Sequence, residues 1–263
     1  MDKAMPIVSL VGAGPGDPEL ITVRGMKRLQ SADVVIYDEL AGAELLAFVR
    51  DDAELIFVGK RCGKHAMEQE RINALLVDKA REGKRVIRLK GGDPFIFGRG
   101  GEELAELVAA GIDVEVVPGV TAAAAAGSAA GVPLTHRELS SGVIFLTGHE
   151  KPGKPESSID WHALAATRMT LCIYMGVKKI ASIAERLVEG GLAVDTPVAI
   201  VSRATWADQQ TLLVTLSELI RGEHGEVPAP ALAIIGPVAS LPRVVAEFGA
   251  AAGRALPSDP AHA

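Results

Sequence analysis

A chain of 263 residues is long enough for one large or two small domains, and 48% hydrophobic with only 4% aromatic residues predicts an aliphatic core. The net charge of −6 argues against general binding to nucleic acid. No apolar run reaches the roughly 18–20 residues that span a bilayer, and no signal peptide is visible. Two cysteines make no disulfide framework and no Cys/His cluster has metal spacing, so we expect a cytoplasmic protein without a metal.

The first predicted strand, residues 6–11, runs into a glycine-rich loop. A dinucleotide fingerprint needs G-x-G-x-x-G opening directly into a helix. Here the third position is Asp17, and prolines delay the helix, which we place at 23–29 with Thr22 as its N-cap. The acid that ends the second strand, Asp38, is where a ribose-binding carboxylate would lie. A dinucleotide-dependent oxidoreductase is therefore an alternative that the glycine spacing and the late helix disfavour.

Apolar strands and amphipathic helices alternate through the first half of the chain. Such alternation predicts an α/β fold with a mostly parallel sheet covered on both faces. Ligands bind beyond the carboxyl ends of the strands in these sheets, so we expect the site in the loops that follow them. The strands are predicted at 6–11, 34–38, 54–59, 85–89 and 114–119, and the helices at 23–29, 69–82 and 102–110.

The fourth strand is followed by the loop on which the interpretation depends, Lys90-Gly-Gly-Asp-Pro-Phe-Ile-Phe-Gly-Arg-Gly-Gly-Glu-Glu103. Glycine permits positive φ and lets the main chain approach a ligand closely. Asp93 is placed to accept hydrogen bonds from ribose hydroxyls or from an amine. An ordinary exposed βα loop is the alternative, but five glycines around a Phe-Ile-Phe core favour a binding loop.

This loop also carries a family resemblance. From Gly91 to Glu103 it resembles the cofactor loop of the tetrapyrrole (precorrin) methylases, and the resemblance extends from Ile7 to about Gly236. Within that family, the chain most resembles the members that methylate uroporphyrinogen III. It implies two α/β domains with mostly parallel sheets and a cofactor cleft between them. It further implies C-methylation of uroporphyrinogen III to precorrin-2 by two successive transfers from S-adenosylmethionine, with S-adenosylhomocysteine as product, in a homodimer.

A second α/β set is predicted after residue 120, and its strand at 209–216 alternates less cleanly and is a candidate antiparallel strand. A helix of small residues, 121–131, allows close approach of a flat ligand or of another backbone. The remaining strands are predicted at 143–148, 170–175, 197–202 and 231–236, with a helix at 178–189. We therefore expect an N-terminal domain at 1–119 with the catalytic loops, a C-terminal domain at 120–250 that completes the cofactor site, and a loose tail at 251–263.

Methylation of a ring carbon requires alignment of the reactants and a group that handles the proton lost afterwards. One carboxylate and one basic group would suffice, and Asp38 and Lys60 each end a strand at the ligand edge. The resemblance assigns Asp38 as proton acceptor and Lys60 as proton donor. From the residues alone, Asp38 equally fits a turn cap and Lys60 a solvated charge.

The resemblance also implies a set of cofactor-binding positions, in which Ala204 stands where the family has a glycine. They are Pro15, Gly91, Gly92, Asp93, Ile96, Thr121, Ala122, Met175 and Ala204.

A polycarboxylate substrate would be repelled by a chain of net charge −6 unless cations gather at the site. We assign Arg61 and Arg137 to substrate binding. They belong to a basic set from three loops: Lys60, Arg61, Lys64, His65, Arg99, His136 and Arg137. The chain departs from the family at Glu39, where an arginine is usual, which puts substrate affinity in question.

Two further alternatives are a precorrin methylase that acts later in corrin synthesis and a non-catalytic binding module. The motif Gly59-Lys-Arg-x-Gly-x-His65, which the resemblance ties to the first methylation step, argues against the first. The pairing of Asp38 with Lys60 argues against the second. No dehydrogenase or chelatase extension is visible, so methylation alone is expected. The resemblance leaves open whether the product goes to sirohaem, haem d1 or cobalamin.

Overall fold

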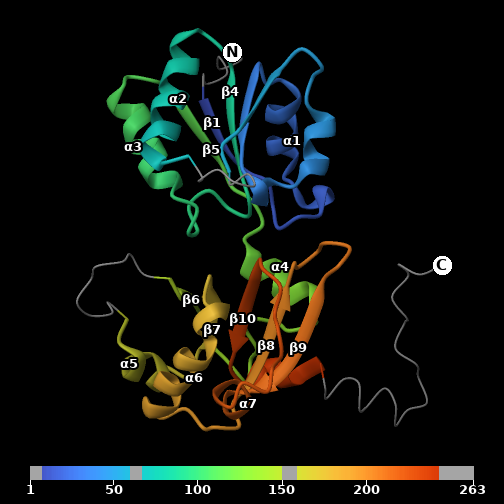
Figure 1. The fold of residues 1–263 in the computed structure, drawn as a ribbon, viewed down its shortest axis with the longest axis vertical. Coiled ribbons are helices and arrows are strands. Elements are labelled where there is room, and N and C mark those ends of the chain that lie inside the picture. The colour runs from blue at the N-terminus through green and yellow to red at the C-terminus, as the bar shows by residue number, and fades with distance from the viewer. Residues whose placement is uncertain (1–7, 60–66, 150–158, 243–263) are drawn as a thin grey trace, which may run out of the picture. The chain divides into compact units, whose positions relative to one another are not determined.

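The computed structural model describes residues 8–59, 67–149 and 159–242. The chain forms two compact units, residues 1–122 and 123–263, each built on its own five-stranded sheet (Figure 1). The prediction of an α/β fold is confirmed.

The sheet of the first unit is entirely parallel, in the order β3-β2-β4-β1-β5. Its strands are β1 (Val8–Gly12), β2 (Val34–Tyr37), β3 (Glu54–Phe57), β4 (Val86–Lys90) and β5 (Val114–Val117). Because β4 lies between β1 and β2, the loops that leave β1, β2 and β4 emerge as neighbours at one edge of the sheet. That edge is where α/β sheets bind ligands.

Helices cover both faces of this sheet. They are α1 (Val23–Gln30), α2 (Gln69–Arg81) and α3 (Gly100–Ala109), with short 3₁₀ turns η1 (Pro18–Leu20), η2 (Glu39–Ala41) and η3 (Ala43–Phe48). On one face α2 and α3 contribute Ile72, Leu76 and Leu107 to an aliphatic core, and on the other α1 contributes Leu29 (Figure 1).

The predicted start of α1 is confirmed in atomic detail. The Thr22 side chain accepts a hydrogen bond from the Gly25 N–H at 3.0 Å, which is the N-cap interaction. The preceding loop instead forms η1, whose first turn is capped by Asp17. A helix therefore does not open directly after the first glycines, as a dinucleotide fingerprint would require.

The second unit begins with the small-residue helix α4 (Ala122–Ala129) and holds a mixed sheet in the order β6-β7-β10-β8-β9. Its strands are β6 (Val143–Thr147), β7 (Thr170–Tyr174), β8 (Pro197–Ser202), β9 (Gln210–Thr215) and β10 (Ala231–Ile235). Its other elements are α5 (Trp161–Ala166), η4 (Val177–Lys179), α6 (Ile180–Glu189), α7 (Leu216–Ile220) and η5 (Pro237–Ser240). Sequence patterns missed the short helices α5 and α7.

The expectation of a mostly parallel sheet is wrong for this second unit. Only β6 and β7 pair in parallel, whereas β10 pairs antiparallel with both β7 and β8, and β9 pairs antiparallel with β8. The strands β6, β7 and β8, which are joined through helices α5 and α6, do run in one direction. However, β9 follows β8 without a helix and turns back, and β10 then enters between β7 and β8.

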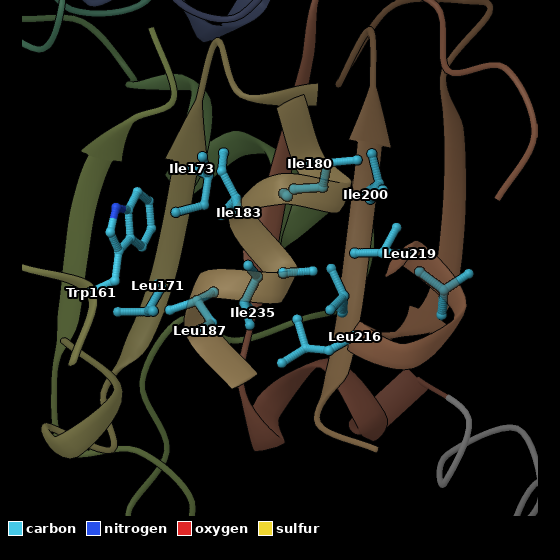
Figure 2. Packing of buried hydrophobic residues seen from close by; sticks show 14 residues of the cluster. Trp161, Leu171, Ile173, Ile180, Ile183, Leu187, Ile200, Leu216, Leu219 and Ile235 are labelled. Carbon is cyan, nitrogen blue, oxygen red and sulfur yellow. The ribbon is translucent and has the colours of Figure 1, made fainter. Parts of the chain in front are cut away.

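The core of the second unit lies between this sheet and helices α5, α6 and α7. Figure 2 shows Ile180, Ile183 and Leu187 of α6 against Ile173 of β7 and Ile200 of β8. On the opposite face of β7, Cys172 is fully buried, and burial raises the pKa of its thiol to about 12. This cysteine is a core residue and not a nucleophile.

Candidate active site

The loops that follow β1 and β4 are joined by backbone hydrogen bonds. The Ala13 N–H donates to the Lys90 carbonyl at 2.8 Å. Gly14 and Gly92 then exchange two hydrogen bonds, of 3.2 and 2.6 Å, and both adopt positive φ. The predicted cofactor loop is therefore anchored to the first glycine-rich loop, and Pro15 lies directly beside this junction.

Two glycines at this edge are required by packing alone. A Cβ on Gly119 would lie 2.2 Å from the Gly92 carbonyl oxygen, and one on Gly12 would lie 2.6 Å from the Gly119 backbone. Gly92 differs, because a Cβ there would meet nothing nearer than the Ala122 nitrogen at 3.7 Å. Gly92 therefore lies next to Thr121 and Ala122, with room for a Cβ in ordinary van der Waals contact.

Asp93 ties this arrangement together. Its Oδ1 accepts a hydrogen bond from the Phe95 N–H at 2.9 Å, and its Oδ2 accepts one from the Gly119 N–H at 3.1 Å. The residue predicted to bind ribose thus also links the β4 loop to the β5 loop. A carboxylate has about four acceptor sites, so two hydrogen bonds do not exhaust its capacity.

The rest of the glycine loop presents a partly buried Ile96 between two exposed phenylalanines, Phe95 and Phe97. Arg99, which sequence analysis placed in the basic set, has a left-handed backbone and an ion pair with Glu102 at 2.6 Å. Both of these charged side chains are about half exposed.

Asp38 follows β2 and has two structural partners. Its Oδ1 accepts a hydrogen bond from the Leu40 N–H at 3.1 Å and so caps η2. Its Oδ2 accepts one from Arg88 Nη2 at 2.8 Å, and its side chain is 26% exposed while that of Arg88 is 4% exposed. The carboxylate therefore lies at the rim of the unit against a buried cation.

The turn that Asp38 caps contacts two neighbouring loops. A Cβ on Gly91 would lie 2.5 Å from Leu40 Cβ, so the cofactor loop packs directly against η2. Gly59, at the end of the third strand segment, lies beside the backbone nitrogen of Glu39. Glu39 itself is exposed. The candidate base, the cofactor loop and the chain leading to Lys60 thus share one edge of the sheet.

Behind Asp38 lies a buried charged network that sequence analysis missed. Arg88 and Lys90 occupy alternate positions of β4, so their side chains lie on the same face of the strand, toward α2 and α3. Both side chains contact Glu103 of α3, whose own side chain is fully buried. Gln69 of α2 donates to the same carboxylate oxygen at 3.1 Å. Burial and the neighbouring Arg88 lower the pKa of Lys90, and Glu103 opposes that change. The sequence does carry a signal for this network, namely two charged residues within a central strand.

Three predicted residues lie in the second unit. Met175 follows β7, is 56% exposed and has positive φ, and Ala204 follows β8 between two residues of positive φ. Because β7 and β8 run in the same direction, both positions lie at one edge of that sheet. Tyr174 precedes Met175 and accepts a hydrogen bond from the Ala123 N–H of α4 at 3.0 Å. Arg137 is exposed.

Lys60 and Arg61, the predicted proton donor and substrate-binding cation, lie outside the described residues, as do Lys64 and His65. In the three described segments, no group of three or more His, Cys, Asp and Glu side chains has an arrangement that could hold a metal ion. Across those same segments, no helix has both the length and the apolar character needed to cross a membrane.

Comparison with known proteins shows the family to which this chain belongs. The family model of the tetrapyrrole (corrin/porphyrin) methylases matches residues 8–220, and the chain belongs to that family. The resemblance drawn from the glycine loop is confirmed.

Particular relatives narrow the comparison. A siroheme synthase of Yersinia pseudotuberculosis is 53% identical over 94% of this chain and 52% of its own length, and one of Pectobacterium atrosepticum is 54% identical over 92% and 50%. The chain thus spans about half the length of these relatives. A uroporphyrin-III C-methyltransferase of Thermus thermophilus, solved with S-adenosylhomocysteine, is 40% identical with a TM-score of 0.78, over 89% of this chain and 99% of that one. A cobalt-precorrin-4 methyltransferase of cobalamin biosynthesis is 33% identical with a TM-score of 0.78, over 88% and 95%.

Proposed function

We propose that this chain is a methyltransferase that converts uroporphyrinogen III to precorrin-2 by two successive transfers from S-adenosylmethionine. The Thermus enzyme named for this substrate supports the assignment, since its alignment covers 89% of the chain at 40% identity. The observation that carries the proposal is the Asp38 carboxylate, held at the ligand edge against Arg88 and packed through η2 on the glycine loop.

The first unit offers a surface that fits the cofactor. Main-chain groups of the β1 and β4 loops converge there, and Gly92, which carries no side chain, lies next to Thr121 and Ala122. The residues that we propose to hold it are Pro15, Gly91, Gly92, Asp93, Ile96, Thr121 and Ala122, together with Met175 and Ala204. When bound, S-adenosylmethionine supplies an electrophilic methyl group on a sulfonium.

The protein's own contribution is alignment and proton transfer. Asp38 takes the proton that the ring system loses as the double bonds of the methylated pyrrole shift, and Lys60 returns a proton to the ring system. The side-chain carboxylates of the substrate pair with cations, of which we assign Arg61 and Arg137 to this role. Glu39, in place of the usual arginine, weakens this binding but leaves the proton acceptor next to it unchanged.

Two features of the chain's setting are also proposed. We infer from the composition that it acts in the cytoplasm, and from the family resemblance that it is a homodimer. Light scattering coupled to size-exclusion chromatography tests the second point, because a mass near 27.4 kDa would mean a monomer and contradict it.

The product identifies the function. The chain is incubated without oxygen with S-adenosylmethionine and uroporphyrinogen III, and tetrapyrroles are separated by mass. We expect the mass of two added methyl groups and two molecules of S-adenosylhomocysteine for each substrate consumed. No methylation of uroporphyrinogen III, but methylation of an already methylated precorrin, would favour the later-acting class. Calorimetry in which NAD but not S-adenosylhomocysteine releases heat would favour the oxidoreductase.

A further inference from the structure

Glu103 is a fully buried carboxylate with donors from two directions. Arg88 Nε at 3.2 Å and Lys90 Nζ at 3.0 Å reach its Oε1 from β4, and Gln69 Nε2 at 3.1 Å reaches the same oxygen from α2. Its Oε2 also lies 3.0 Å from Lys90 Nζ. Three donors on one carboxylate fix its orientation tightly.

Packing alone does not explain these charges. Leu107 and Leu76, from the helices that supply Glu103 and Gln69, are fully buried in an aliphatic cluster with Val86 of β4. Burying paired charges in such surroundings is costly, and apolar residues of similar volume often serve stability as well or better. A role beyond stability is therefore the more economical explanation for Glu103.

The geometry of Arg88 indicates what that role is. Its guanidinium donates through Nε to Glu103, through Nη1 to the Leu89 carbonyl at 2.9 Å, and through Nη2 to Asp38 Oδ2 at 2.8 Å. A guanidinium is planar and rigid, so holding Nε sets the direction of Nη2. The buried end of this chain of contacts is Glu103, and its exposed end is the candidate base.

We infer that Glu103 is a positioning residue for methyl transfer, which acts through Arg88 to hold the Asp38 carboxylate in its catalytic orientation. The formal charges of Arg88 and Lys90 together balance those of Glu103 and Asp38. The inference rests on the proposed role of Asp38 as proton acceptor. Glu103 touches neither substrate nor cofactor in this arrangement.

The first test is Glu103→Gln, which keeps the size of the side chain and removes its charge. We expect kcat to fall by about 10- to 100-fold, because small misplacements of a catalytic group have effects of that order. KM for uroporphyrinogen III and Kd for S-adenosylhomocysteine should stay within about threefold, because Glu103 contacts neither ligand. Glu106→Gln, an exposed position on the same helix, is the matched control and should keep the wild-type kcat.

A double-mutant cycle with Asp38→Asn separates positioning from general loosening of the fold. If Glu103 acts through Asp38, Glu103→Gln should slow the Asp38→Asn enzyme by less than about twofold. Independent losses that multiply would overturn the inference while leaving Asp38 as the base. A wild-type rate for Asp38→Asn alone would instead overturn the proposed role of Asp38, and the inference with it.

A second variant covers the case in which Glu103→Gln does not fold. Glu103→Leu combined with Lys90→Met removes both charges together and replaces the pair with apolar side chains, which buried sites tolerate. This protein should fold and bind S-adenosylhomocysteine as wild type does, with kcat lowered as for Glu103→Gln. A wild-type kcat in this double variant would refute the positioning role.

Discussion

Arg88 Nη2 donates a 2.8 Å hydrogen bond to Asp38 Oδ2, while the Leu40 N–H occupies the other oxygen of that carboxylate. A turn cap and an ion pair therefore coexist on one side chain, each through a different oxygen. The capping reading of Asp38 and the catalytic reading do not compete, since the Leu40 N–H, which is the capping contact, and Arg88 together fix the carboxylate's orientation.

Asp93→Asn tests the residue that joins the β4 and β5 loops. Asparagine can accept from the Phe95 N–H, but its amide nitrogen cannot accept from the Gly119 N–H. We expect a stability loss of about 1–3 kcal/mol, measured by urea unfolding, because a partly buried donor is left unpaired. S-adenosylhomocysteine should also bind more weakly by calorimetry. Asp113→Asn, an exposed residue ahead of β5, is the control. Unchanged affinity in folded Asp93→Asn would restrict Asp93 to a structural role.

Gly119→Ala tests the close approach of three backbone segments. The added Cβ would lie 2.2 Å from the Gly92 carbonyl, and no flexible side chain is there to move aside. Overpacking of this kind costs about 1–3 kcal/mol or more. Gly101→Ala, where a Cβ meets nothing within 4 Å and the residue lies in α3, should be neutral or stabilising. Equal melting temperatures for the two variants would contradict the packing argument.

Asp33 provides a pH-dependent contribution to stability. Hydrogen bonds from Arg85, whose Nη2 lies 2.6 Å from Asp33 Oδ1, hold the pKa of this carboxyl well below its ordinary value, against the opposing effect of burial. Because the folded pKa is depressed, the stabilisation is complete above the unfolded pKa of about 3.9 and is lost as pH falls from there through the folded value.

The substitution Asp33→Asn should therefore lower the free energy of unfolding by about 1–2 kcal/mol at pH 7. The gap between variant and wild type should stay constant down to about pH 5 and close below about pH 4. Urea unfolding at several pH values measures this difference in the free energy of unfolding, with exposed Asp51→Asn as the control. A gap that widens as pH falls would have the wrong sign for a depressed pKa.

Much of the first unit could be predicted because its signals are local. Thr22 caps α1 within three residues, and each strand is a short run of mostly apolar residues. The network behind Asp38 was not predictable in this way. Arg88 and Lys90 alternate with apolar residues, as in a strand with one solvated face, but both are buried and share the partner Glu103 in the next helix.

The other missed features also depend on distant pairing. The position of β10 between β7 and β8 is decided by contacts with strands that precede it by about 30 to 60 residues in the chain, which periodicity does not encode. Likewise, Asp93 was identified as a site residue, but its bond to Gly119 depends on how β5 ends beside β4 and β1. The family resemblance supplied the candidate residues, and the structure supplied their partners.

The central claim is that Asp38 takes the proton lost from the methylated ring, and single-turnover methylation by Asp38→Asn tests it most directly. General-base catalysis contributes about 10²- to 10⁴-fold, so the first transfer to uroporphyrinogen III should slow by that factor. S-adenosylhomocysteine affinity, measured on the same preparation, should remain within about twofold, because Asn keeps the Leu40 contact that shapes η2. A variant that binds S-adenosylhomocysteine normally and methylates at the wild-type rate would show that Asp38 is not the proton acceptor.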